Sequence, residues 1–181
     1  MIVKDIWPNN AEVARWVDQL GGLTLPGLLE RARAEMNAGH GDVVSFSRKV
    51  FIPLTRLCRD VCGYCAFAEA PQPGRFPYLI PEEVIDIAAA GANAGCTEAL
   101  FTLGERPEER YRVARDGLAS LGHDTTLSYL AAMARYVVEE TGLLPHVNAG
   151  VMGESDLAML RKVSVSQGLM LEGTSQRLTE R

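Results

Sequence analysis

Three of the four cysteines lie close together, in the segment Cys58-Arg59-Asp60-Val61-Cys62-Gly63-Tyr64-Cys65. Thiolates at this C-x3-C-x2-C spacing can surround one compact metal centre. A [4Fe–4S] cluster has four irons, so three cysteine ligands leave one iron open to a small molecule. Two alternatives remain at this point: thiols that bind no metal, and a structural zinc site. The fourth zinc ligand would then come from one of the remaining candidates: Cys96, His40, His123 or His146.

The elements that must position these cysteines are four short apolar runs and the helical segments between them. The runs predict strands at residues 50–54, 99–103, 143–147 and 168–171. Helical periodicity is seen around residues 84–91, 111–121, 127–138 and 154–162. Strands without alternation that are covered by helices indicate a parallel α/β sheet, either a barrel or an open doubly wound sheet. Pro53 and Pro145 weaken two of the strand predictions, because proline cannot donate to a ladder.

Two further helices are predicted ahead of the sheet, at residues 13–20 and 25–36. Thr24 is expected to cap the second helix at its N-terminus and Gly39 at its C-terminus. We therefore expect residues 1–42 to form an N-terminal helical extension and residues 43–181 to form the core domain. Ile80 stands where a capping Ser or Thr would be expected before the helix that starts at Pro81.

Polar residues follow or end the predicted strands. Because the carboxyl ends of parallel strands meet at one edge, we expect Cys58, Glu105, Asn148 and Glu172 to face a common mouth. Glu172 could bind ribose hydroxyls or shuttle a proton there. The alternatives are a solvated helix-start glutamate for Glu105, a turn asparagine for Asn148 and a surface glutamate for Glu172. The charges that follow Glu105, up to residue 112, indicate a solvated helix start.

The cysteine segment and its flanks resemble a known signature. Residues 50–68, with Phe-Ile-Pro-Leu-Thr ahead of the cysteines, resemble the radical S-adenosylmethionine (SAM) motif. More narrowly, they resemble the CofG-type half of 7,8-didemethyl-8-hydroxy-5-deazariboflavin (FO) synthase. Residues 98–108, which include Leu-Gly-Glu-Arg-Pro-Glu, agree with it, as do residues 144–152 and 166–172. The resemblance runs from about Ser45 to the C-terminus.

The resemblance implies two cofactors, a [4Fe–4S] cluster and SAM. In such enzymes SAM chelates the open iron, and an electron from the cluster cleaves SAM into methionine and a 5′-deoxyadenosyl radical. The implied substrate is the adduct between the hydroxybenzyl group of tyrosine and 5-amino-6-ribitylaminouracil. The implied partners are a CofH-type enzyme, or a fused half of that type, and an electron donor. The alternatives are another radical SAM enzyme, of the CofH or menaquinone-pathway type, and a non-catalytic metal-binding remnant.

The resemblance also implies roles for individual residues. Cys58, Cys62 and Cys65 would hold the cluster. Tyr64 would contact the adenine, with a packing aromatic as the alternative, and Gly104 and Glu105 would meet the SAM ammonium. The remaining expected roles are cofactor binding for Ser166, cofactor binding and catalysis for Asn148, and catalysis for Glu172.

The number of predicted strands differs from that of the family. A radical SAM core is a partial (β/α)6 barrel, whereas about four β/α units are present here. We therefore expect an incomplete, TIM-like partial barrel, truncated at the C-terminus and inactive alone. Apolar surface is expected to be exposed around Leu169, Met170 and Leu171.

Composition limits the remaining classes. The net charge is −5, which disfavours nucleic acid as a partner, and no apolar run is long enough to cross a membrane. The first five residues include the charged Lys4 and Asp5, where a signal peptide would have its apolar stretch. We expect a cytoplasmic protein with reduced thiols. The hydrophobic fraction, 47%, is sufficient for a packed core.

Overall fold

The computed structural model describes residues 10–170, which form two compact units that divide between Phe46 and Ser47. The first unit contains α1 (Asn10–Gly21) and α2 (Leu25–His40). Thr24 caps α2 as predicted, since its hydroxyl accepts a hydrogen bond from the Gly27 N–H at 3.4 Å. The prediction for Gly39 is wrong: the helix continues to His40 and ends at Gly41, whose φ of 60° lies in the left-handed region that favours glycine.

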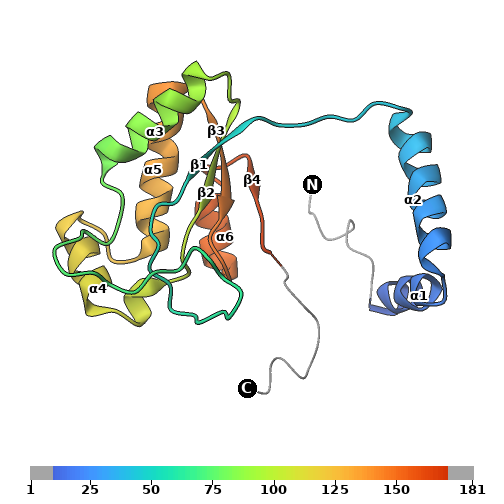
Figure 1. The fold of residues 1–181 in the computed structure, drawn as a ribbon, viewed down its shortest axis with the longest axis horizontal. Coiled ribbons are helices and arrows are strands. Elements are labelled where there is room, and N and C mark those ends of the chain that lie inside the picture. Colours follow the sequence, from blue (N-terminus) through green and yellow to red (C-terminus); the bar gives the residue numbers. More distant parts are fainter. Residues whose placement is uncertain (1–9, 171–181) are drawn as a thin grey trace. The chain divides into compact units, whose positions relative to one another are not determined.

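The second unit is built on a four-stranded parallel sheet with the order β1-β2-β3-β4 (Figure 1). The strands are β1 (Lys49–Ile52), β2 (Glu98–Thr102), β3 (Leu144–Asn148) and β4 (Ser166–Gln167). The helices are α3 (Pro81–Asn93), α4 (Arg112–Ser120), α5 (Thr126–Thr141) and α6 (Glu154–Leu160), with the short 3-10 helix η2 (Pro107–Glu109). Within residues 10–170, no helix is both long and apolar enough to cross a membrane.

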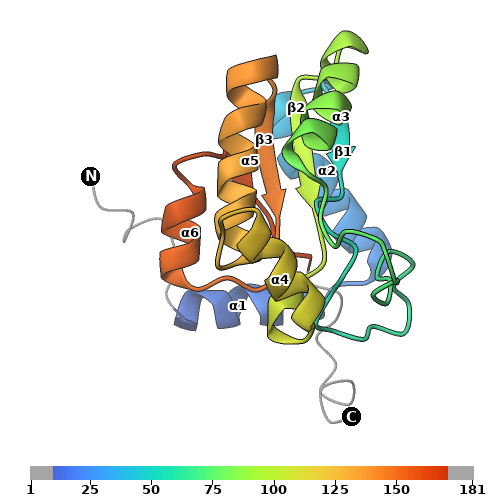
Figure 2. The same ribbon diagram turned by 90° about the vertical axis from the view of Figure 1, so that its left-hand side faces the viewer.

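The strand order distinguishes between the two architectures that the sequence allows. A doubly wound sheet reverses its strand order at a switch point, whereas this sheet advances by one strand at every crossover. Right-handed crossovers in one direction place the helices on one face of the sheet. Figures 1 and 2 show α3 and α5 together on the same side of β1, β2 and β3. The expected incomplete barrel of β/α units is therefore confirmed in these four units. The other side of the sheet is called the inner face below.

Three of the four predicted strands agree with the structure to within two residues. The fourth does not: it lies at Ser166–Gln167 rather than at residues 168–171. In the part of the chain that the structure describes, β4 pairs with β3 through two residues, and Gly168 continues the ladder by donating from its N–H to the Val147 carbonyl at 2.9 Å. Leu169 and Met170, which follow it, are exposed as expected, and Leu171 lies outside the described residues.

Pro145 fits inside β3 because of the side to which its backbone points. Its carbonyl accepts a hydrogen bond from the Val165 N–H at 3.0 Å, so it faces β4. An N–H on residue 145 would also face that side. It would point to a position in the chain before Ser166, where β4 begins, so no residue of β4 would pair with it. Proline therefore removes no ladder hydrogen bond at this position.

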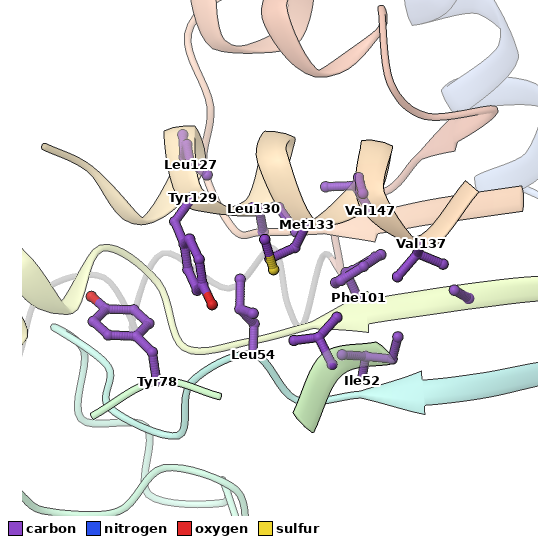
Figure 3. Close-up of a cluster of buried hydrophobic side chains, with 14 of the residues drawn as sticks. Ile52, Leu54, Tyr78, Phe101, Leu127, Tyr129, Leu130, Met133, Val137 and Val147 are labelled. Carbon is purple, nitrogen blue, oxygen red and sulfur yellow. The ribbon is translucent and has the colours of Figure 1, made fainter. Parts of the chain in front are cut away.

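The hydrophobic core lies between the sheet and the helices on its outer face (Figure 3). Phe101 and Val147 are fully buried there against α5 residues such as Leu130 and Val137. Close packing of α3 on β1 requires Gly91, because a Cβ there would lie 2.6 Å from Val50 Cγ1. As expected for Ile80, no side chain caps α3 at that position; instead Glu83 Oε2 accepts the Ile80 N–H at 3.0 Å.

The inner face carries a polar cluster near the start of the strands. Lys49 Nζ lies 2.8 Å from Glu98 Oε2, and hydrogen bonds from Lys49 and Ser47 lower the pKa of Glu98. His146 Nδ1 lies 2.5 Å from Ser166 Oγ. Burial, followed by the charge of Lys49, lowers the pKa of His146. This cluster is separate from the carboxyl ends of the strands, where we expect the site.

Candidate functional site

The loop after β1 brings the first cysteine against the loop after β2. The Cys58 sulfur accepts hydrogen bonds from the backbone N–H groups of Glu105 at 3.3 Å and Asp60 at 3.4 Å. Arg59 returns one from its N–H to the Glu105 carbonyl at 2.9 Å. The two loops touch at Gly104, where a Cβ would lie 2.6 Å from the Leu57 carbonyl carbon and closer still to its oxygen. The structure thus brings together Cys58, Gly104 and Glu105, as the parallel arrangement of strands predicts.

The other two cysteines lie on the same loop in a more open setting. Cys62 and Cys65 are exposed, Cys58 is half-buried, and all three are free of disulfides. A turn joins Cys62 and Cys65, in which the Cys65 N–H donates to the Cys62 carbonyl at 3.0 Å. Within residues 10–170, no three His, Cys, Asp or Glu side chains are gathered around a metal position. The donor set nevertheless fits an iron–sulfur cluster, because three soft thiols lie on one short, exposed loop.

Glu105 connects the loops that follow β1, β2 and β3. Its carboxylate pairs with the Arg59 guanidinium and accepts a hydrogen bond from the Val151 N–H at 3.2 Å. Gly150 makes this approach possible, because a Cβ there would lie 2.8 Å from Glu105 Cδ. The hydrogen bond to Glu109, at 2.5 Å, is the main cause that raises the pKa of Arg59. Arg59 therefore stays charged beside Glu105.

The residues after Glu105 also bind other β/α units, and this corrects one expectation from the sequence. Arg106 pairs with Asp156 of α6 at 2.6 Å. Glu108 is buried rather than solvated: its carboxylate accepts hydrogen bonds from the Thr126 N–H at 3.0 Å and hydroxyl at 2.6 Å. It thereby satisfies one backbone N–H in the first turn of α5 from a distant segment. No local pattern indicates this contact, because the two partners are far apart in sequence.

The remaining candidates are placed as follows. Asn148 ends β3 on the inner face, at the mouth, and pairs in register with Thr102 of β2. Ser166 pairs with His146, which comes two residues before Asn148. Ser166 therefore lies farther from the carboxyl ends of the strands than Asn148 does. Tyr64 is exposed on the cysteine loop. Glu172 lies outside the described residues.

One functional candidate was missed by the sequence reasoning. The Thr102 hydroxyl is buried and finds no hydrogen-bond partner among the described residues. A threonine at the end of an apolar run gives no signal of this kind, because the signal depends on what surrounds the side chain in the folded chain.

A cavity of about 370 Å³ lies beside the cysteine loop but does not include the cysteines. It is lined in part by Arg56, Glu69 and Arg75, and Glu69 pairs with both arginines, at 2.5 and 2.7 Å. The hydrogen bond from Arg56 is the main cause that lowers the pKa of Glu69. The cavity is also lined by Glu83, which accepts the Ile80 N–H rather than pairing with an arginine. The two arginines and Glu69 thus form an ion-pair cluster at this cavity, separate from the cysteines.

Comparison with proteins of known structure defines the class of fold. The chain superposes on methylornithine synthase with a TM-score of 0.54 and 21% identity, over 84% of this chain and 42% of that one. The four β/α units therefore resemble part of the fold of that protein. No model of a known protein family matches the sequence.

Sequence comparison identifies the particular relatives. The chain is 50% identical over 172 residues to the FO synthase of Mycobacterium tuberculosis, and the match covers 90% of this chain and 20% of that protein. It is 57% identical over 141 residues to the FO synthase of Mycobacterium leprae, covering 76% and 16%. It is 50% identical over 138 residues to the 7,8-didemethyl-8-hydroxy-5-deazariboflavin synthase of Methanopyrus kandleri, covering 76% and 41%. The resemblance to the FO synthases is confirmed, and the chain corresponds to one segment of these proteins.

Proposed function

We propose that this chain is a radical SAM module that acts in the formation of the deazaflavin FO. The observation that carries the proposal is the contact between the Cys58 sulfur and the Glu105 backbone. It joins the C-x3-C-x2-C loop to the Gly104-Glu105 turn at the carboxyl ends of β1 and β2, where β/α folds build their sites. The identity of about 50% to the FO synthases supports the specific chemistry.

Cys58, Cys62 and Cys65 would hold the [4Fe–4S] cluster. When bound, the cluster and SAM supply the one-electron chemistry that generates a carbon-centred radical. The protein fixes Cys58 through two backbone N–H groups, whereas the open part of the loop would close as the thiols take up the metal. Glu105 would accept a hydrogen bond from the SAM ammonium, and Tyr64 would cover the adenine.

The substrate we propose is the hydroxybenzyl adduct of 5-amino-6-ribitylaminouracil, made available by a CofH-type partner. An external donor would supply the electron. Asn148 would orient SAM or this substrate from the end of β3, and Glu172 would hold a ribose hydroxyl or move a proton. Ser166 would contact the cofactor only if it exchanged its hydrogen bond to His146 for one to the ligand.

A segment exchange tests the assignment to FO formation. In the FO synthase of Mycobacterium tuberculosis, the matching segment is replaced by residues of this chain. We expect the chimera to form FO, measured by its fluorescence, because the cysteine loop and its contacts are carried as one piece. A matched chimera with Cys62→Ala is the negative control. A soluble chimera that loads iron but forms no FO would contradict the assignment and favour another radical SAM reaction.

The role of Glu105 can be separated from its ion pair with Arg59. Glu105→Ala is expected to weaken SAM binding to the cluster-loaded chain by ten- to a hundred-fold, since one charge-assisted contact contributes about 1.5–3 kcal/mol. Arg59→Met removes the ion pair but keeps the carboxylate. Isothermal titration with SAM is the measurement. If Arg59→Met retains its affinity for SAM, Glu105 contacts SAM directly. An equal loss of SAM affinity in both variants would contradict direct contact and show that Glu105 acts only by connecting the loops.

A further inference from the structure

We propose that Thr102 and Asn148 form a hydrogen-bonding subsite for a neutral, hydroxyl-bearing ligand group on the inner face of the sheet. The two residues are partners in the register of β2 and β3, at the carboxyl end of each strand. Their helix-facing neighbours Phe101 and Val147 are core residues, so both side chains belong to the opposite, inner face. The inference rests on the proposed function for the identity of the ligand.

The Thr102 hydroxyl is the first observation. Its oxygen is buried, and no group within residues 10–170 bonds to it. Buried polar atoms are nearly always paired, because leaving one unpaired sacrifices its hydrogen bonds to water. The other buried threonines differ in this respect: Thr55 donates to the Pro77 carbonyl and Thr126 to Glu108. A ligand that reaches Thr102 would supply the missing partner.

The room left for Asn148 is the second observation. A Cβ at Gly168 would lie 2.5 Å from Asn148 Oδ1, so the carboxamide occupies the space that any other residue at 168 would fill. His146, two residues earlier on the same face, is already bonded to Ser166. The glycine therefore leaves room for the Asn148 carboxamide on the inner face, at the strand position that pairs in register with Thr102.

The chemistry of the pair selects the ligand group. A hydroxyl and a carboxamide each donate and accept hydrogen bonds and carry no charge. Glu105 pairs with Arg59 at the strand ends and Lys49 pairs with Glu98 at the strand starts, so neither ion pair includes Thr102 or Asn148. The subsite thus suits a neutral alcohol of a pentose or polyol. Under the proposed function, two ligands carry such groups: the ribose of SAM and the ribityl chain of the substrate.

Thr102→Val tests the subsite without any ligand. Valine keeps the shape and removes the unpaired hydroxyl, so we expect the metal-free chain to unfold about 2–4 °C higher. The matched control is Thr126→Val, which removes a hydroxyl bonded to both Glu108 and Tyr78 and should lower the unfolding temperature. A lower temperature for Thr102→Val would overturn the inference, because it would show that the hydroxyl already has a partner.

Ligand titration then identifies the occupant. The cluster-loaded chain and its variants are titrated separately with SAM and with 5-amino-6-ribitylaminouracil. We expect Thr102→Val to weaken one of the two by roughly three- to tenfold, as for one lost hydrogen bond, and Thr102→Ser to restore it. Weaker SAM binding assigns the subsite to the ribose, and weaker ribitylaminouracil binding assigns it to the ribityl chain. Unchanged affinity for both, or binding of neither by the unaltered chain, would overturn the inference. Failure of the proposed function would instead show as absent iron–sulfur loading, with the unfolding result intact.

Discussion

Alanine at any one of Cys58, Cys62 or Cys65 is expected to abolish stable iron–sulfur loading after anaerobic reconstitution. Each thiol is one ligand of one cluster, and the loop offers no fourth cysteine in its place. Unaltered protein should take up about four iron and four sulfide per chain. The measurements are metal and sulfide content and the electron paramagnetic resonance signal of the reduced protein.

Cys96→Ala is the matched control for these variants. Cys96 lies just after α3, packed against the core rather than on the cysteine loop, so its loss should leave loading unchanged. Normal loading in Cys62→Ala would contradict the ligand assignment. Uptake of one zinc that resists replacement by iron would contradict the radical SAM proposal itself and support a structural zinc site.

Gly104→Ala is expected to have the largest effect on the fold outside the buried core. The added Cβ would meet the Leu57 carbonyl, a backbone group that cannot rotate away. Moving the two loops apart would also break the Gly104 N–H bond to the Thr55 carbonyl, which is 3.1 Å long, and the Glu105 N–H bond to Cys58. We expect unfolding in denaturant to show a loss of about 2–4 kcal/mol.

The control is a second glycine on the cysteine loop. Gly63 has a φ outside the left-handed region, and no atom lies within 4 Å of the position a Cβ would take. Gly63→Ala should therefore leave the stability of the metal-free chain within about 0.5 kcal/mol of the unaltered value. Equal stability of both variants would show that the loops do not approach each other at Gly104 as described.

The sequence predicts the outer face of the fold better than the site. Apolar runs mark β1, β2 and β3, but the expected lack of alternation is wrong. Burial alternates along β2 and β3, and the helix-facing residues, such as Phe101 and Val147, are the ones that belong to the core. The same reasoning misplaces β4, where the pairing residues are Ser166 and Gln167 and the apolar residues follow it. Periodicity could not choose between a barrel and a doubly wound sheet, because the choice depends on the order of strands and not on their composition.

Within the site, parallel strands alone predict that Cys58 and Glu105 meet. The burial of Glu108 and the unpaired hydroxyl of Thr102 were not predictable, because both depend on residues brought together only by folding. The pairing of Glu105 with Arg59 was not predicted either, since each is an ordinary charged residue in sequence. Local patterns identify the residue types of a site, whereas the hydrogen-bond partners come from tertiary structure.

The contacts of residues 105–108 have a consequence for how this segment can change. Glu105, Arg106 and Glu108 each bind a different part of the fold, through Arg59, Asp156 and Thr126 respectively. Substitutions here should be non-additive with substitutions at those distant partners. If residues 105–108 were grafted into another β/α protein, the sequence of the segment would be retained but its geometry would not, unless the three partners were transferred with it.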